Sequence, residues 1–416
     1  MWESLKLKDL KIGKKLGKGS FGDVYEAQVN GHDGIFALKI LDKSKYKRNP
    51  KGYKYLENEI AILKNTAHEN IVKLYSSDIE TFLFRYLVTE YCNGGDLEQC
   101  LEYYKSTKKR PFTEEEVQHI MRQIVSAIKY LHVEKKIIHR DLKLTNILLH
   151  YDNEIDRIQK NILKSKVKII DFGFARYINE ELANSTLGSP LFMDPRILFK
   201  MGKVTDNELK YEEKADIYSL GVICYLLLTG NMLFDVTTMQ DLLKETDKAV
   251  YKISVNLSKE TISFLNYMLK YDPKKRLDIE SLSKHNFIIK NVKKFTKIDK
   301  NKVGNNLKGS KLVFNMKEST IQYLNDDDSD KSEPVEVDER TKKLIDTLNG
   351  IGNKIKDIKE FPQNIKIKKE EPKLDKDIEK LIFDSIDIIN NDEIYLEPKI
   401  TPFIPGIEPD LLLINE

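Results

Sequence analysis

His139-Arg140-Asp141-Leu142-Lys143-Leu144-Thr145-Asn146 and, further along the chain, Asp171-Phe172-Gly173 are the two stretches that decide the fold. The first ends in an apolar run at residues 147–149, and the second follows another at residues 167–170. Short apolar runs bounded by polar turns are typical of buried strands. We therefore expect the runs to pair as one hairpin, with the two polar stretches at adjacent ends of it.

This hairpin would gather four polar side chains around one small volume: Asp141, Lys143, Asn146 and Asp171. Phosphoryl transfer depends mostly on positioning and charge neutralisation. A carboxylate can orient an acceptor hydroxyl, a carboxylate with an amide can bind a metal, and an ammonium can neutralise the moving phosphoryl group. Each residue alone could be an ordinary surface charge, but their order and spacing together favour this chemistry.

The composition narrows the class of protein. The chain has 416 residues, enough for two or more domains, and its formal net charge of +3 gives no argument for a nucleic-acid or membrane partner. Cys92, Cys100 and Cys224 lack metal-ligand spacing and indicate free thiols of a reducing compartment, which predicts a cytoplasmic location. Charges near the start argue against an export signal, and we expect the apolar stretch 217–234 to be a buried helix rather than a transmembrane segment.

A glycine-rich turn, Gly17-Lys18-Gly19-Ser20-Phe21-Gly22, separates predicted strands within residues 10–41. The glycine spacing alone is weak evidence, because dinucleotide sites and plain turns share it. Here a strand-like run with Val24 and Tyr25 follows, whereas a dinucleotide site would open a helix. A strand-turn-strand flap can lay its backbone N–H groups over phosphates.

Lys39 ends the next predicted strand, and Glu59 lies in a predicted helix at residues 54–65. Behind a phosphate flap, an inward lysine indicates a ligand for phosphate oxygens, and Glu59 is its expected partner. The alternatives are a solvated lysine at a strand end and a glutamate on a helix surface.

Two further predicted strands lead to a glycine turn at residues 93–96, which we expect to connect two lobes. Adenine would meet backbone groups at residues 90–92. Asp96 could bind a ribose hydroxyl or cap a helix, and Cys92 could be no more than a packed thiol. After Thr113, which opens a capping box, apolar residues recur with helical spacing and predict a buried helix.

Taken together, residues 9–290 resemble a eukaryotic-type serine/threonine protein kinase. The matching motifs, in chain order, are GKGSFGDV, FALK, ENEIAIL, HRDLKLTN, DFG, DIYSLG and DPKKRL with HNF. The resemblance implies an α+β, bilobal fold with a β-rich N-lobe at residues 9–91, a hinge at 90–95 and a helical C-lobe at 96–290.

The resemblance also implies roles for single residues. Asp141 would orient the substrate hydroxyl and accept its proton, Lys143 would neutralise the phosphoryl group, and Asn146 with Asp171 would hold Mg²⁺. Lys39, paired with the helix glutamate, would hold the phosphates of ATP. The implied ATP-binding residues are Gly17, Gly19, Ser20, Gly22, Val24, Ala37, Lys39, Glu90, Cys92, Asp96, Asn146 and Asp171.

In this family, an arginine at the position of Arg140 goes with control by phosphorylation of the activation loop. Thr186 is the preferred regulatory site and Ser185 the second candidate, although both could be ordinary loop residues. The apolar stack that tracks the active state in the family matches Leu63, Leu74, His139 and Phe172, with Asp216 beneath them.

The sequence departs from the family at Asp194-Pro195-Arg196, where Ala-Pro-Glu is usual. The usual glutamate pairs with an arginine that matches Arg276, so Arg196 would place two cations together, which is costly when buried. We hypothesise that Asp194, or an acid of the loop 203–213, pairs with Arg276 instead.

The segments DFGFARYI and TLGSPLFM look most like the autophagy-initiating kinases, as does the long segment before DFG, which we expect to be a charged surface loop. Calcium-regulated and mitotic kinases share parts of this pattern. The rival interpretation is a pseudokinase, an ATP-binding scaffold that docks no substrate productively. The complete catalytic set favours an active enzyme with a protein substrate.

Residues 291–340 carry a block of lysines and then a block of acids, which predicts a disordered charged linker. Residues 341–416 show two short apolar stripes of helical spacing and then a proline-containing tail, which predicts a partly disordered, partly helical extension. These helices would dock on the kinase domain or bind a regulatory protein. A helical hairpin without regulatory role is the alternative, and Phe383 fits a core position better than a short peptide motif.

Overall fold

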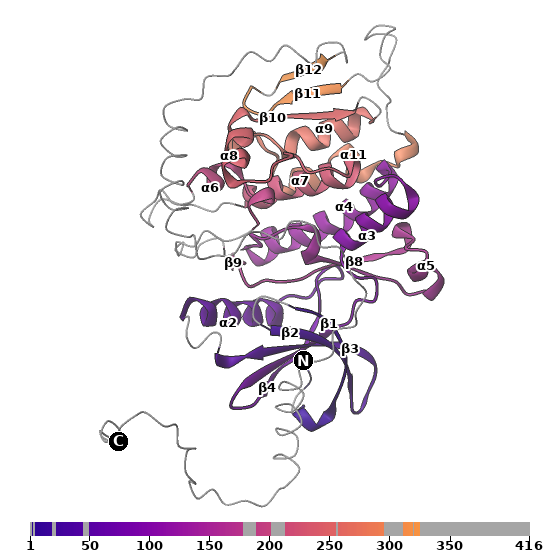
Figure 1. Cartoon of the computed structure of the whole chain (residues 1–416), viewed down its shortest axis with the longest axis vertical. Coiled ribbons are helices and arrows are strands. Elements are labelled where there is room, and N and C mark those ends of the chain that lie inside the picture. The colour runs from indigo at the N-terminus through magenta and orange to yellow at the C-terminus, as the bar shows by residue number, and fades with distance from the viewer. Residues whose placement is uncertain are drawn as a thin grey trace, which may run out of the picture. The chain divides into compact units, whose positions relative to one another are not determined.

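The structure is a computed structural model, and it describes residues 2, 5–18, 22–44, 50–177, 189–200, 213–254, 257–294, 311–318 and 320–324 (Figure 1). The chain divides into two units, Met1–Phe361 and Pro362–Glu416, and every described residue belongs to the first. The extension predicted at residues 341–416 lies outside the described residues, so its predicted helices stay a prediction.

The N-terminal part contains a five-stranded antiparallel sheet and the helix α2 (Pro50–Asn65) (Figure 1). In the order β1-β2-β3-β5-β4, the strands are β1 (Leu10–Lys18), β2 (Gly22–Val29), β3 (His32–Asp42), β5 (Phe84–Glu90) and β4 (Leu74–Glu80). In β3, buried Leu38 and Ile40 alternate with half-exposed Ala37 and Lys39, because successive side chains of a strand point to opposite faces. The predicted β-rich lobe is confirmed.

Helices dominate the part of the chain after the fifth strand (Figure 1). The capping box of Thr113 and Glu116 begins the fourth helix, as predicted. The seventh helix is apolar all round and almost fully buried, which confirms the core helix expected near 217–234. The bounds are α3 (Leu97–Tyr103), α4 (Glu114–Lys129), α5 (Glu154–Ile158), α6 (Pro195–Lys200), α7 (Lys214–Thr229), α8 (Met239–Lys248), α9 (Lys259–Met268), α10 (Ile279–Ser283) and α11 (Asn286–Ile289).

Short helical turns complete the described chain. Turns of 3-10 helix lie at Leu7–Asp9, Leu144–Asn146, Ile162–Lys164, Pro190–Phe192, Pro273–Lys275 and Val292–Lys294, and π-helical turns lie at Tyr104–Lys108 and Tyr130–Lys135. None of the helices in the described residues is both long enough and apolar enough to cross a membrane.

The hairpin expected from the two deciding stretches is present. β7 (Ile147–His150) pairs antiparallel with β8 (Lys166–Ile169), and β6 (Ile137–Ile138) pairs with β9 (Arg176–Tyr177). The segment between β7 and β8 was expected to be a surface loop. It contains α5 and buries Tyr151 and Ile162, so apolar anchors fix a segment that its charge alone does not explain.

A three-stranded sheet corrects the prediction of a disordered linker at residues 291–340. β10 (Val250–Ser254) pairs antiparallel with β11 (Lys311–Asn315), which pairs with β12 (Thr320–Leu324). Leu312, Phe314 and Met316 are buried at alternate positions. The prediction is wrong for β11 and β12 because it weighed the surrounding charge blocks above this short alternation of period two.

Candidate active site

Lys39 of β3 and Glu59 of α2 form the ion pair that the sequence predicted. Lys39 Nζ lies 2.8 Å from Glu59 Oε1 and 3.1 Å from Oε2. Burial lowers the pKa of Lys39, but the carboxylates of Glu59 and Asp171 outweigh burial and raise that pKa above its ordinary value. Lys39 therefore stays protonated at neutral pH, and the negative charge of Asp171 helps to stabilise the protonated form.

The turn between β6 and β7 presents Asp141 inside a network of donors. Lys143 Nζ lies 2.8 Å from Asp141 Oδ2, and Asn146 Nδ2 donates to Oδ2 at 3.0 Å and to the Asp141 carbonyl at 2.8 Å. The backbone N–H of Ser189 donates to Oδ1 at 3.0 Å. The structure thus brings three of the four predicted residues into direct contact and adds Ser189, which the sequence reading did not assign to the site.

Asp216, at the start of α7, holds this turn from beneath. Its carboxylate accepts from the backbone N–H of His139 at 2.8 Å and of Arg140 at 2.9 Å, and contacts His132 Nε2 at 2.8 Å. Burial raises the pKa of Asp216, but the hydrogen bonds from His132 and His139 outweigh it and hold that pKa below its ordinary value. Arg140 has a φ of 72°, and an ionised carboxylate stabilises this left-handed backbone.

Phe172 of DFG is fully buried, and its ring centroid lies 5.0 Å from that of His139. Leu63 and Leu74 are buried as well, in keeping with the predicted apolar stack. Asn58 of α2 donates to the carbonyl of Ala175 at 2.6 Å, so the helix that carries Glu59 is tied to the chain just after DFG.

The chemistry of Asn146 and Asp171 fits a magnesium site, since Mg²⁺ prefers carboxylate and carbonyl oxygens. Both donor bonds of the Asn146 amide go to Asp141, which leaves its amide oxygen for a metal. Asp171 has a φ of 65°, and one of its carboxylate oxygens accepts from the Gly173 N–H at 3.3 Å. The second oxygen of that carboxylate remains for the metal.

The residues predicted to bind the nucleotide come from strands of the sheet and from the hinge. Val24 of β2 pairs with Lys39 of β3, so these two predicted ATP-binding positions lie side by side, and Ala37 of β3 pairs with Thr89 of β5. Gly94 permits close packing in the hinge, because a Cβ there would lie 2.7 Å from the Leu149 carbonyl oxygen.

Two hinge predictions left alternatives open. Asp96 caps α3, accepting from the Gln99 N–H at 2.8 Å, so the capping role is present. Cys92 is half-buried, and burial raises the pKa of its thiol to about 12, as in a packed neutral thiol. Glu90 forms an ion pair with Lys168 of β8 at 2.6 Å, a contact that sequence reasoning missed.

Several predicted residues lie outside the described residues: Gly19, Ser20, Ser185 and Thr186. Gly17 and Gly22 are described, at the end of β1 and the start of β2. The predicted phosphate flap and the regulatory site therefore stay predictions.

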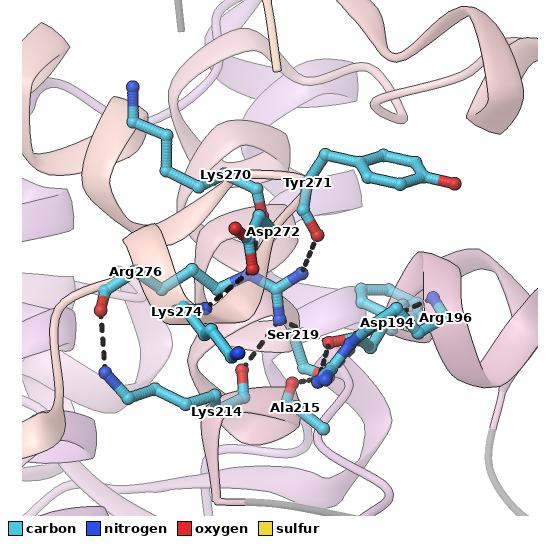
Figure 2. A network of polar contacts seen from close by, with 11 residues as sticks. Asp194, Arg196, Lys214, Ala215, Ser219, Lys270, Tyr271, Asp272, Lys274 and Arg276 are labelled. Carbon is cyan, nitrogen blue, oxygen red and sulfur yellow. Dashed lines mark hydrogen bonds and ion pairs between the residues drawn. The ribbon is translucent and has the colours of Figure 1, made fainter. Parts of the chain in front are cut away.

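The hypothesis for Arg276 is confirmed for Asp194. The two side chains form an ion pair, and neither exposes any surface (Figure 2). Arg276 also donates to the carbonyls of Lys270 at 2.6 Å, Lys214 at 3.0 Å and Tyr271 at 3.1 Å. The acid that anchors the segment therefore comes from the first position of Asp194-Pro195-Arg196, where the resemblance places it at the third.

Arg196, which occupies the usual place of the glutamate, binds the same carboxylate. Its backbone N–H donates to Asp194 Oδ1 at 2.8 Å, and its guanidinium lies 3.3 Å from both carboxylate oxygens. Asp194 thus compensates two arginines (Figure 2). This explains how the substitution at position 196 is accommodated.

Comparisons with known proteins agree with this geometry. The protein kinase domain family matches residues 10–288. Calcium-dependent protein kinase 5 of Plasmodium berghei is 37% identical over 284 residues, which cover 66% of this chain and 45% of that protein. Serine/threonine-protein kinase atg1 of Dictyostelium discoideum is 32% identical over 284 residues, which cover 67% of this chain and 39% of that protein.

The matched region thus spans less than half the length of these curated relatives. The family match, in contrast, covers most of this chain and includes the Lys39–Glu59 pair, the turn around Asp141 and the DFG segment. The chain therefore belongs to the protein kinase domain family.

Proposed function

We propose that the chain is an active kinase that transfers the γ-phosphoryl group of ATP to serine or threonine hydroxyls of protein substrates. The observation that carries this proposal is the formed Lys39–Glu59 pair beside a complete Asp141 network. A pseudokinase usually lacks a member of this set, and none of its described members is replaced here.

Asp141 acts on the substrate hydroxyl. Lys143 and Asn146 hold its Oδ2 oxygen, and Ser189 holds Oδ1, so the carboxylate is fixed before substrate arrives. Its carboxylate orients the hydroxyl and accepts the proton as the oxygen attacks the γ-phosphorus. Lys143 lies beside it and neutralises charge on the transferred group.

The remaining residues bind the nucleotide. Lys39, oriented by Glu59, binds phosphate oxygens, and Asn146 with Asp171 would hold Mg²⁺. Bound Mg²⁺ neutralises negative charge on the phosphates. The fixed positions of these side chains cost no reorganisation at the moment of transfer.

A phosphotransfer assay on a generic basic protein tests this function. We expect the wild-type chain to label the substrate with γ-phosphate and Asp171→Ala to lose that activity. Equal signals from the two proteins would leave the ATP-binding pseudokinase scaffold as the function.

We further propose that phosphorylation of Thr186 switches the enzyme on, through Arg140. Arg140 supports this because its backbone is fixed by Asp216 beside the catalytic carboxylate, where a phosphate could order the loop. Mass spectrometry of active enzyme should find phosphate on Thr186, and Thr186→Ala should lower turnover, with Ser185→Ala as the matched control. Full turnover of Thr186→Ala, with no phosphate on the loop, would contradict the proposal.

For the cellular role, we propose autophagy initiation in the cytoplasm. The support is the likeness to the serine/threonine kinase atg1, although a calcium-dependent kinase is similar to a comparable extent. Cells in which the gene encodes the Asp171→Ala variant should show lower autophagic flux during starvation than wild-type cells. Flux equal to that of wild-type cells would exclude this role, but it would not contradict the proposed kinase activity.

We also propose that residues 341–416 bind a regulatory protein. The support is the sequence alone, whose two apolar stripes are each too short to be stable helices in isolation. Affinity purification with and without these residues tests it, and identical sets of bound proteins would refute it.

A further inference from the structure

The hairpin of β11 and β12 follows the region that matches the kinase family, yet it is built into the C-terminal lobe. Phe314 and Leu312 each expose 1% of their surface. The Phe314 ring stacks on that of Tyr251 in β10, with centroids 4.7 Å apart and planes at 9°. Strand pairing and this stack together fix the hairpin on the lobe.

The turn that joins the two strands contacts the chain just before the anchoring arginine. The Met316 N–H donates to the Ala249 carbonyl at 2.7 Å, and the Tyr271 N–H donates to the Met316 carbonyl at 3.2 Å. Lys317 adds an ion pair to Asp247 at 2.9 Å and lies 5.2 Å from the centre of the Tyr271 ring. Tyr271 is therefore held by both the backbone and a side chain of the turn.

Tyr271 also belongs to the polar network of Arg276 and Asp194, which anchors residues 189–200. Its N–H binds the hairpin, and its carbonyl accepts from Arg276 Nη2 at 3.1 Å (Figure 2). Arg276 in turn forms the buried ion pair with Asp194. One residue thus joins the hairpin to the network that holds residues 189–200, the segment in which Ser189 binds the catalytic Asp141.

We propose that the hairpin, residues 311–324, is a positioning element for substrate binding. By fixing Tyr271, it keeps Arg276 in the geometry that a buried ion pair with Asp194 demands, and so it holds residues 189–200 in the conformation that receives the protein substrate. The proposal rests on the proposed kinase function. If the hairpin has this role, the functional catalytic domain ends at residue 324 and not near residue 290.

Full-length Phe314→Ala tests the proposal, with Phe314→Leu as the conservative variant. We expect the KM for protein substrate to rise about ten-fold while the KM for ATP changes less than about two-fold. Phe112→Ala is the matched control, because Phe112 is an equally buried ring on another part of the lobe, next to Tyr104. A lower kcat with unchanged substrate KM would mean a structural role only and would overturn the proposal.

If Phe314→Ala fails to fold, Lys317→Ala replaces it. Lys317 is exposed, and Lys248→Ala is its control, since Lys248 forms an exposed ion pair with Glu245 at 2.7 Å that does not involve Tyr271. We expect substrate KM to rise about two- to three-fold for Lys317→Ala only. Combined with Asp194→Asn, its effect should be smaller than in the wild-type background, because both act through one anchor. Effects that multiply in the double variant would contradict this route.

Hydrogen exchange separates this proposal from the proposed function, because it needs no activity. Faster exchange at residues 189–200 and 270–276 in the hairpin variants supports the positioning role even if the wild-type chain transfers no phosphate. Unchanged exchange at residues 189–200 overturns it even if the chain is an active kinase.

Discussion

Asp194→Ala most directly tests the buried ion pair between Asp194 and Arg276, which anchors residues 189–200. Asp194 and Arg276 expose no side-chain surface, so removing the carboxylate leaves a buried cation without its counter-charge. Breaking a buried pair in this way costs about 3–5 kcal/mol. Three backbone carbonyls still accept from Arg276, which favours the lower end, about 3 kcal/mol.

A loss of this size is easy to measure in a thermal melt. At roughly 2–4 °C per kcal/mol, the midpoint should fall by about 6–12 °C. Arg196→Ala is the control, because Arg196 is one-third exposed and binds the same carboxylate through longer contacts. We expect that variant to lie within about 1 kcal/mol of wild type.

A double variant separates charge compensation from packing. Replacing both partners by apolar residues, Asp194→Leu with Arg276→Met, removes the pair without leaving a buried charge. We expect the double variant to be more stable than Asp194→Ala. A midpoint for Asp194→Ala within about 2 °C of wild type would refute the reasoning, because it would mean that the buried arginine needs no carboxylate.

Three further predictions concern the active site. Lys39→Met should lower phosphotransfer on the order of 100-fold, since it removes a preorganised cation from the phosphates, and a γ-phosphate transfer assay measures this. Asp171→Ala should abolish the thermal stabilisation by ATP with Mg²⁺, which for wild type reaches about 2.7 kcal/mol at 100 times Kd, and melts with EDTA give the metal-free baseline. The lowered pKa of Asp216 predicts stability that is complete above the unfolded-state pKa of about 3.9 and is lost as the pH falls through the lower folded value. The difference in midpoint between wild type and Asp216→Asn should shrink as the pH falls below about 4.

Much of the catalytic centre could be predicted because its chemistry is local in sequence. Asp141, Lys143 and Asn146 lie on one turn between short strands, so their spacing alone places them together. The pair of Lys39 and Glu59 was expected from the inward lysine behind the phosphate flap, but the alternatives stayed open because a strand and a helix 20 positions apart supply it. The charge conflict at Arg196 predicted a compensating acid but left Asp194 and the acids of the loop 203–213 as alternatives, and the structure identifies Asp194.

Other contacts had no local signal. Ser189 reaches Asp141 across 48 positions of chain, and only the Gly188-Ser189-Pro190 motif hints at it. The strands β11 and β12 were missed because each is five residues long and is surrounded by lysines and acids. What stabilises them is tertiary packing on β10, and no periodicity within the hairpin itself reveals that partner.

The hairpin has a consequence for the order in which the protein folds during synthesis. β10 is synthesised well before its partner β11, so the edge of β10 that pairs with β11 stays without its partner in the meantime. At about 5–20 residues per second, the stretch between the end of the family-matched region and residue 324 takes on the order of 2–7 s to translate. During that interval the nascent kinase has its catalytic residues but lacks the strands that complete its C-terminal lobe.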